Sequence, residues 1–79
     1  MSSSLYVVYD EVAELYTAPL TLKNDNVAMR WFQEKMQKAS DPTDYKLYKI
    51  GEYDENTGLI VALPSLSLID TGKKLESEA

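Results

Sequence analysis

The chain is predicted to be an α+β protein, a small antiparallel β-sheet of about four strands in the order β-β-α-β-β with one helix packed across one face. Three observations predict this fold. Segments rich in β-branched and aromatic residues alternate like strands, one amphipathic segment lies between them, and a polar turn joins the last two strand segments. Because both strand pairs can close as hairpins, we expect one sheet covered by the helix.

The first predicted strand covers residues 5–10 and reads Leu-Tyr-Val-Val-Tyr-Asp. Alternate residues of a strand point to opposite faces of the sheet, and here both faces are largely apolar, which predicts a central strand. Residues 14–22 are a weaker second strand, in which Pro19 lacks the N–H that a sheet ladder needs. We therefore expect a bulge, an edge or a break at Pro19.

A helix is predicted from an N-cap at Asn24 to about Ala39. The Asn24 side chain suits an N-cap, and Asp25 in the first turn favours the positive end of the helix dipole. Apolar side chains at helical spacing form one stripe, with two more on its flank: Ala28, Met29, Phe32, Met36 and Ala39, then Val27 and Trp31. Pro42 ends the helix, because proline disfavours the α conformation in the residue before it.

The second hairpin is the clearest local signal in the chain. Residues 45–53 form the third strand and residues 54–58 the turn, where Gly58 suits a left-handed backbone position. The fourth strand is expected at residues 59–63, and Pro64 is expected to end it.

A short edge strand is expected at residues 66–69. Seventy-nine residues make at most one domain, which we place at residues 5–70. Residues 1–4 and 72–79 are polar, and we expect them to be flexible termini.

The composition excludes several kinds of site. The chain has no cysteine and no histidine, so a disulfide or a thiolate or histidine metal site is ruled out, and we expect no metal and no cofactor. Domains this small usually need a disulfide, a bound metal or association with another chain to be stable. Association is the one that remains, so we expect a homo-oligomer with a dimer favoured. No apolar run approaches the length of a transmembrane helix, and no membrane partner is expected.

The charge is acidic overall and mildly basic in the middle. Thirteen acidic and eight basic residues give a net charge of −5, which argues against binding nucleic acid by general electrostatics. Lys46 and Lys49 nevertheless interleave with tyrosines on the third strand, as in many surfaces that stack single-stranded bases. Strict alternation places Tyr45 and Tyr53 on one face and Tyr48 on the other, so the tyrosines cannot form one platform.

Two patterns point to enzyme or metal chemistry but are incomplete. The segment Asp70-Thr-Gly matches the Asp-Thr-Gly motif of aspartic proteases. It lies too near the end of the sequence for the β-structure that such enzymes need after this motif. The turn at residues 54–58 resembles the start of a calcium loop, but Gly58 and Ser65 stand where oxygen ligands are required. We expect no catalytic residue and no enzymatic activity.

Several short segments of the sequence resemble those of a known protein family. They are residues 5–10, Pro19-Leu20 before Lys23-Asn24-Asp25, Val27-Ala28, and Tyr48-Lys-Ile-Gly-Glu-Tyr-Asp-Glu-Asn-Thr-Gly58. These segments resemble those of the small nonstructural protein of gokushoviruses, which are single-stranded DNA phages of the microvirus family. The resemblance covers roughly residues 5–70 and implies a phage protein that works in the host bacterial cytoplasm. It supplies no catalytic residue.

Taken with the central cations, the resemblance predicts a non-enzymatic accessory protein that binds single-stranded DNA in phage genome replication or packaging. The candidate DNA-binding residues are Lys46, Tyr48, Lys49, Lys23, Arg30, Lys35 and Lys38. The alternative is a protein-interaction module that engages a phage replication or capsid protein, or a host factor, without binding DNA. Such a module would use the apolar flank of the helix or an exposed sheet edge.

Overall fold

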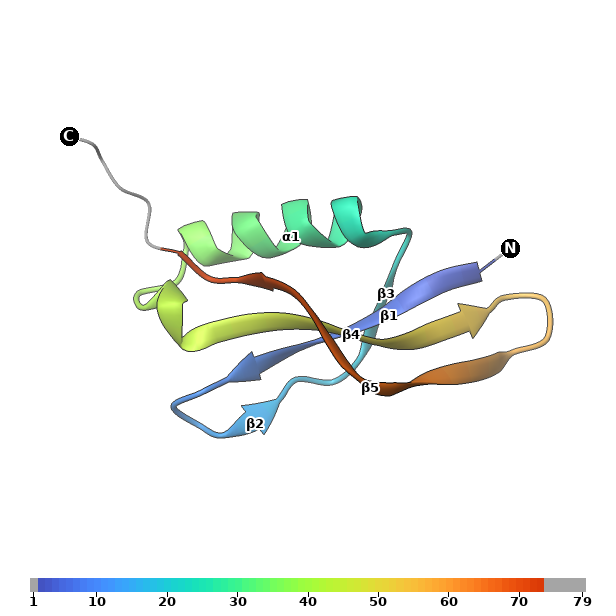
Figure 1. Cartoon of the computed structure of the whole chain (residues 1–79). Coiled ribbons are helices and arrows are strands. Elements are labelled where there is room, and N and C mark those ends of the chain that lie inside the picture. Colours follow the sequence, from blue (N-terminus) through green and yellow to red (C-terminus); the bar gives the residue numbers. More distant parts are fainter. Residues whose placement is uncertain (1, 74–79) are drawn as a thin grey trace.

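The structure, a computed structural model, describes residues 2–73 and consists of one antiparallel sheet with one helix across it (Figure 1). The elements in chain order are β1 (Ser2–Asp10), β2 (Leu15–Tyr16), β3 (Leu20–Leu22), α1 (Asp25–Gln37), a 3-10 turn (Pro42–Asp44), β4 (Tyr45–Asp54) and β5 (Leu59–Thr71). The order of the strands across the sheet is β2-β1-β4-β5, and β3 pairs with β1 on the same side as β2. The predicted antiparallel sheet with one covering helix is therefore present, with a different strand division.

The helix begins as the sequence predicts. The side chain of Asn24 accepts a hydrogen bond of 2.9 Å from the backbone N–H of Val27, which satisfies one of the free donors of the first turn. The helix ends at Gln37, two residues before the expected Ala39, and the backbone N–H of Lys38 caps its last carbonyls.

The core lies between α1 and one face of the sheet. Its buried side chains are Tyr6, Val8, Ala28, Phe32, Met36 and Leu47. They come from β1, β4 and the apolar stripe of the helix, so the predicted stripe packs against the two central strands. Leu5 and Val7 are also buried, and by alternation they lie on the other face of β1, which we call the far face.

The expected second strand is divided into two short strands. β2 pairs with the end of β1 and β3 with its middle, and the residues between them, including Pro19, belong to no strand. Of the three expected outcomes at Pro19, the structure shows the break. It follows from the missing N–H of proline.

The expected end of the fourth strand at Pro64 is wrong. β5 continues through Pro64 to Thr71 as a single strand, and residues 66–69 belong to it. Ala62 pairs with Gly51 and Ser67 with Lys49, so a bulge takes up the residues between. Pro64 lies in that bulge, where the ladder requires no N–H.

The two ends of the described chain are packed. Residues 2–4, predicted as part of a flexible terminus, belong to β1, and Ser4 is buried. Gly72 is buried against Pro42, and its backbone N–H donates to the carbonyl of Tyr45 at 2.9 Å. Residues 1 and 74–79, the rest of the predicted flexible termini, lie outside the described residues.

Candidate functional site

The candidate cation Lys46 lies on the far face of β4. It is paired in register with Tyr9, which follows Val7 on that face. Its ammonium forms an ion pair with the carboxylate of Glu11 in the turn after β1, and the hydrogen bond from that pair raises the pKa of Lys46. A phosphate would have to compete with Glu11 for this ammonium.

Lys49 lies on the opposite, helix-facing side of β4. It pairs in register with Tyr6, and its ammonium is 2.5 Å from a carboxylate oxygen of Glu52. The hydrogen bond to Glu52 raises the pKa of Lys49, because it stabilises the charged form. The structure therefore separates Lys46 and Lys49 and gives each of them an acidic partner.

The ring of Tyr48 belongs to a cluster of tyrosines on the far face. Tyr9 and Tyr16 lie 4.6 Å apart between ring centroids, and Tyr16 meets Tyr48 edge-on at 6.2 Å. These distances are those of favourable aromatic pairs. Stacking on a base would therefore compete with contacts inside the chain.

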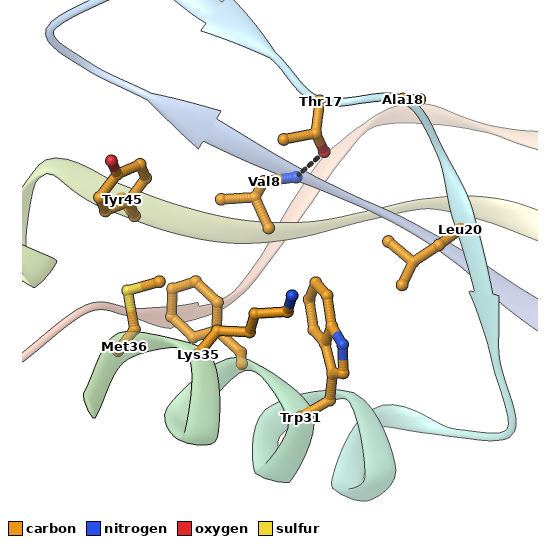
Figure 2. Close-up of a pocket in the computed structure, with 9 residues that line it drawn as sticks. Val8, Thr17, Ala18, Leu20, Trp31, Lys35, Met36 and Tyr45 are labelled. Carbon is orange, nitrogen blue, oxygen red and sulfur yellow. Dashed lines mark hydrogen bonds between the residues drawn. The ribbon is translucent and has the colours of Figure 1, made fainter. Parts of the chain in front are cut away.

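A second group of candidates gathers on one side of α1. Trp31, Lys35 and Lys38 stand at positions i, i+4 and i+7, which share a face of a helix. Figure 2 shows the Lys35 side chain beside the Trp31 ring. Its ammonium lies 5.7 Å from the centre of the ring, within the range of a cation–π contact. Trp31 is half-buried, while both lysines are exposed.

Trp31 and Lys35 also line a groove between the helix and the strands (Figure 2). The groove has a volume of about 420 Å³, and its lining residues are Val8, Thr17, Ala18, Leu20, Trp31, Phe32, Lys35, Met36 and Tyr45. The hydroxyl of Thr17 accepts a 3.0 Å hydrogen bond from the backbone N–H of Val8, which fixes the rim opposite the helix. The groove is apolar, with the Lys35 ammonium at one side.

A smaller hollow of about 150 Å³ is lined by Trp31, Glu34, Lys35 and Lys38. Trp31 and Lys35 therefore line both the groove and this hollow, where two lysines and one carboxylate gather. The two lysines can hold an anion, and Glu34 weakens that attraction.

The other two candidate cations are placed elsewhere. Lys23 is exposed between β3 and the N-cap, and Arg30 is exposed five positions before Lys35, so it faces another side of α1. The structure therefore brings Lys35 and Lys38 together with Trp31, and Lys46 and Tyr48 share the far face of β4. Lys23, Arg30 and Lys49 lie apart from both groups. The sequence predicts Trp31 only on the flank of the apolar stripe and not as a site residue. Its helical spacing with Lys35 and Lys38 is the signal that could have placed it among the candidate site residues.

The two patterns weighed for catalysis or calcium have structural roles. Asp70 accepts a hydrogen bond of 2.5 Å from the Gln33 side-chain amide, which ties β5 to α1. Asp54 accepts a 2.9 Å hydrogen bond from the backbone N–H of Asn56, and this bond lowers the pKa of the Asp54 carboxyl. Gly58 has the expected left-handed conformation, with φ of 76°.

The fold and this site define a small α+β domain, a curved antiparallel sheet with one helix, in which a half-buried tryptophan and two exposed lysines meet beside an apolar groove. Within residues 2–73, no helix is both long enough and apolar enough to cross a membrane. The chain belongs to the Phage ORF5 protein family, whose model matches residues 3–75. Neither the curated proteins nor the solved structures contain a match to the chain.

Proposed function

We propose that this phage protein is a non-enzymatic accessory protein that binds single-stranded DNA as an oligomer during genome replication or packaging in the host bacterial cytoplasm. The sequence segments that resemble the gokushovirus nonstructural protein support this role. The observation that carries the proposal is the pairing of Trp31 with Lys35 at the mouth of the groove. We place the DNA contact there, and not on β4.

The chemistry of this site suits one unpaired base and the phosphates beside it. A base can stack on the exposed part of the indole, and stacking on an aromatic side chain contributes about 1–3 kcal/mol per base. Lys35 and Lys38 would hold the neighbouring phosphates. A duplex base cannot enter, because its faces are already stacked. The proposal is therefore one of selective binding to single strands.

The acidity of the chain sets the expected strength of binding. Because the chain has a net charge of −5, general coating of DNA is disfavoured. The proposal assigns phosphate contacts only to Lys35 and Lys38, the two lysines beside Trp31. Each phosphate neutralised on a single strand contributes about −0.7 to the slope of log affinity against log salt concentration. We expect a slope near −1.4, shallower than that of basic DNA-coating proteins.

The fluorescence of the protein provides a direct test, because Trp31 is the only tryptophan. Titration with oligothymidine at about 50 mM salt, where electrostatic binding is strong, should quench and shift the emission of Trp31. The double variant Lys35→Glu, Lys38→Glu should lose this response. Lys46→Glu is the control and should keep it, because the ammonium of Lys46 is already bound by Glu11.

Three outcomes of this titration have distinct meanings. Absence of any response at low salt refutes the DNA contact at Trp31. An equal response to duplex DNA contradicts base stacking, and an equal loss in Lys46→Glu moves the contact to the far face.

The alternative role, a protein-interaction module, has one specific observation in its favour. β5 is an edge strand with several exposed apolar side chains, among them Leu59, Ile60 and Val61. Exposed apolar edges are sites where another strand can add. A chain that ignores DNA but retains a β5-dependent association with a protein would favour this role.

A further inference from the structure

The free edge of β5 is unlike an edge strand that a monomer would tolerate. β5 forms the end of the sheet order, so its outer backbone groups pair with no other strand among residues 2–73. Leu59, Ile60 and Val61 are 66%, 61% and 66% exposed. Isolated edges are usually protected by charged side chains, short length, prolines or bulges. The stretch from Leu59 to Ala62, between the turn and the bulge, has no charged side chain and no proline.

Both faces of this stretch are apolar. Val61 pairs in register with Glu52 and Ile60 with Tyr53, so the two side chains lie on opposite faces of the sheet. Apolar side chains on both faces are the pattern of a central strand, and not of an edge. Figure 1 shows that this end of the hairpin extends past the start of α1, so the helix does not cover it.

We propose that the stretch Leu59–Ala62, here called the β5 edge, pairs antiparallel with the β5 edge of a second copy of this chain. The two sheets would then join around a two-fold axis into one continuous sheet. An isologous pairing of this kind satisfies the free backbone groups of both copies with the same contact. The inference rests on the oligomeric part of the proposed function and is independent of DNA binding.

The distribution of charge favours a second copy as the occupant. Two copies with a net charge of −5 repel each other, except where they meet through uncharged surface. From Leu59 to Ile69 the chain contains no charged residue. An antiparallel pairing about a two-fold axis at Val61 places Val61 opposite Val61 of the other copy, and it brings Glu55 of the turn to the level of the uncharged residues 65–67 of that copy. No like charges then stand directly opposite each other, a placement that would destabilise the pair.

The core of the single chain is small, so a contact with a second copy would stabilise the fold. Within residues 2–73, only eight hydrophobic side chains are buried in the single chain. A domain of this size is marginal without a staple, and the chain has no cysteine and no histidine to provide one. Pairing at the β5 edge would add backbone hydrogen bonds and would cover part of the apolar side chains that the monomer leaves in water.

Sedimentation equilibrium between about 1 μM and 1 mM tests the proposal, since this range covers weak and moderate dimers. The wild-type chain should reach twice its monomer mass, and Val61→Lys should remain a monomer over the same range. Asn56→Lys, with the same change of charge in the exposed turn, is the matched control and should still form the dimer. Far-UV circular dichroism of each variant checks that the fold is retained.

Crosslinking gives a second measurement that does not depend on a disruptive variant. The native chain lacks cysteine, so Val61→Cys introduces a single thiol. A disulfide forms only between Cβ atoms about 4 Å apart, so oxidation should link two copies through this position and fail to do so in Asn56→Cys. A monomeric wild type at the highest concentration overturns the proposal. So does a dimer that persists in Val61→Lys without crosslinking in Val61→Cys, because its interface would lie elsewhere. Either result leaves the oligothymidine titration intact as a test of DNA binding.

Discussion

The hydroxyl of Tyr6 donates a hydrogen bond of 2.6 Å to a carboxylate oxygen of Asp25. Tyr6 is fully buried in β1, and Asp25 is the first residue of α1, so this bond connects the middle of the sheet to the start of the helix. Burial, followed by the bond to Asp25, raises the pKa of Tyr6 from 10.0 to about 12. The neutral phenol is therefore strongly preferred in the folded chain.

Tyr6→Phe should destabilise the fold without emptying the core. The substitution removes the hydroxyl and keeps the ring, so the loss is that of one hydrogen bond to a charged group. Because Asp25 is exposed, we expect the lower part of the usual range, about 1–2 kcal/mol. Urea unfolding followed by circular dichroism measures it. Tyr53→Phe, outside the helix-side core, is the control and should change little.

The pKa of Tyr6 also predicts a loss of stability at high pH. The folded chain holds this proton more tightly than the unfolded chain, whose tyrosine titrates near the ordinary value of 10.0. The contribution is fully present below pH 10 and declines as the pH rises toward about 12. The free energy of unfolding of wild type and Tyr6→Phe should therefore converge over this interval. A constant difference between the two curves would show that the raised pKa is wrong.

Gly51 is predicted to be intolerant of any side chain. It pairs with Leu5 on one side and Ala62 on the other, and a Cβ at this position would lie 2.6 Å from the carbonyl oxygen of Val61. That oxygen belongs to the backbone of the neighbouring strand, so the strands must separate. Gly51→Ala should cost about 1–3 kcal/mol, as overpacking usually does.

Thermal unfolding measures the cost at Gly51, since 1 kcal/mol shifts the midpoint by about 4–8 °C in a domain of this size. Asn56→Ala in the turn is a suitable control. An unchanged midpoint in Gly51→Ala would contradict the close approach of β4 and β5.

The sequence predicted the elements better than their pairing. Strand and helix patterns at β1, α1 and the turn ending at Gly58 depend on local chemistry, and the structure follows them closely. The bulge at Pro64 could not be predicted, because it depends on how β5 meets β4. Proline is a reliable sign that a ladder bond is missing, and it does not reveal whether the strand ends or continues past a bulge.

A second bulge explains why strict alternation was wrong for the tyrosines of β4. Lys49 pairs with Tyr6, and Gly51 pairs with Leu5, so Ile50 has no partner in β1. The faces of the following residues are thereby exchanged, and Tyr53 lies on the far face, opposite to Tyr45. The same exchange puts Lys49 and Glu52 on one face, although residues three apart in a regular strand face opposite sides. Their ion pair depends on this bulge, which no local pattern announces.

The candidate site was predicted in part, for a related reason. The cations were identified from the sequence, but their acidic partners come from distant elements, as Glu11 does for Lys46. The meeting of Trp31 and Lys35 is local to the helix, whereas the groove beside them needs Leu20 and Tyr45 from two strands. Helical spacing can thus find the pair, and only the fold provides the cavity.

The bond between Gln33 and Asp70 predicts how the end of β5 is held. The Gln33 amide donates to Asp70 at 2.5 Å, so this hydrogen bond joins α1 to the end of β5. In a double-mutant cycle with Gln33→Ala and Asp70→Ala, the two losses should not add, and we expect a coupling of about 0.5–3 kcal/mol. Urea denaturation of the four chains measures it. Additive losses would mean that the bond contributes nothing to stability. A peptidase activity that disappears in Asp70→Asn, while the fold is retained, would instead give this aspartate the catalytic role that its contact with the helix argues against.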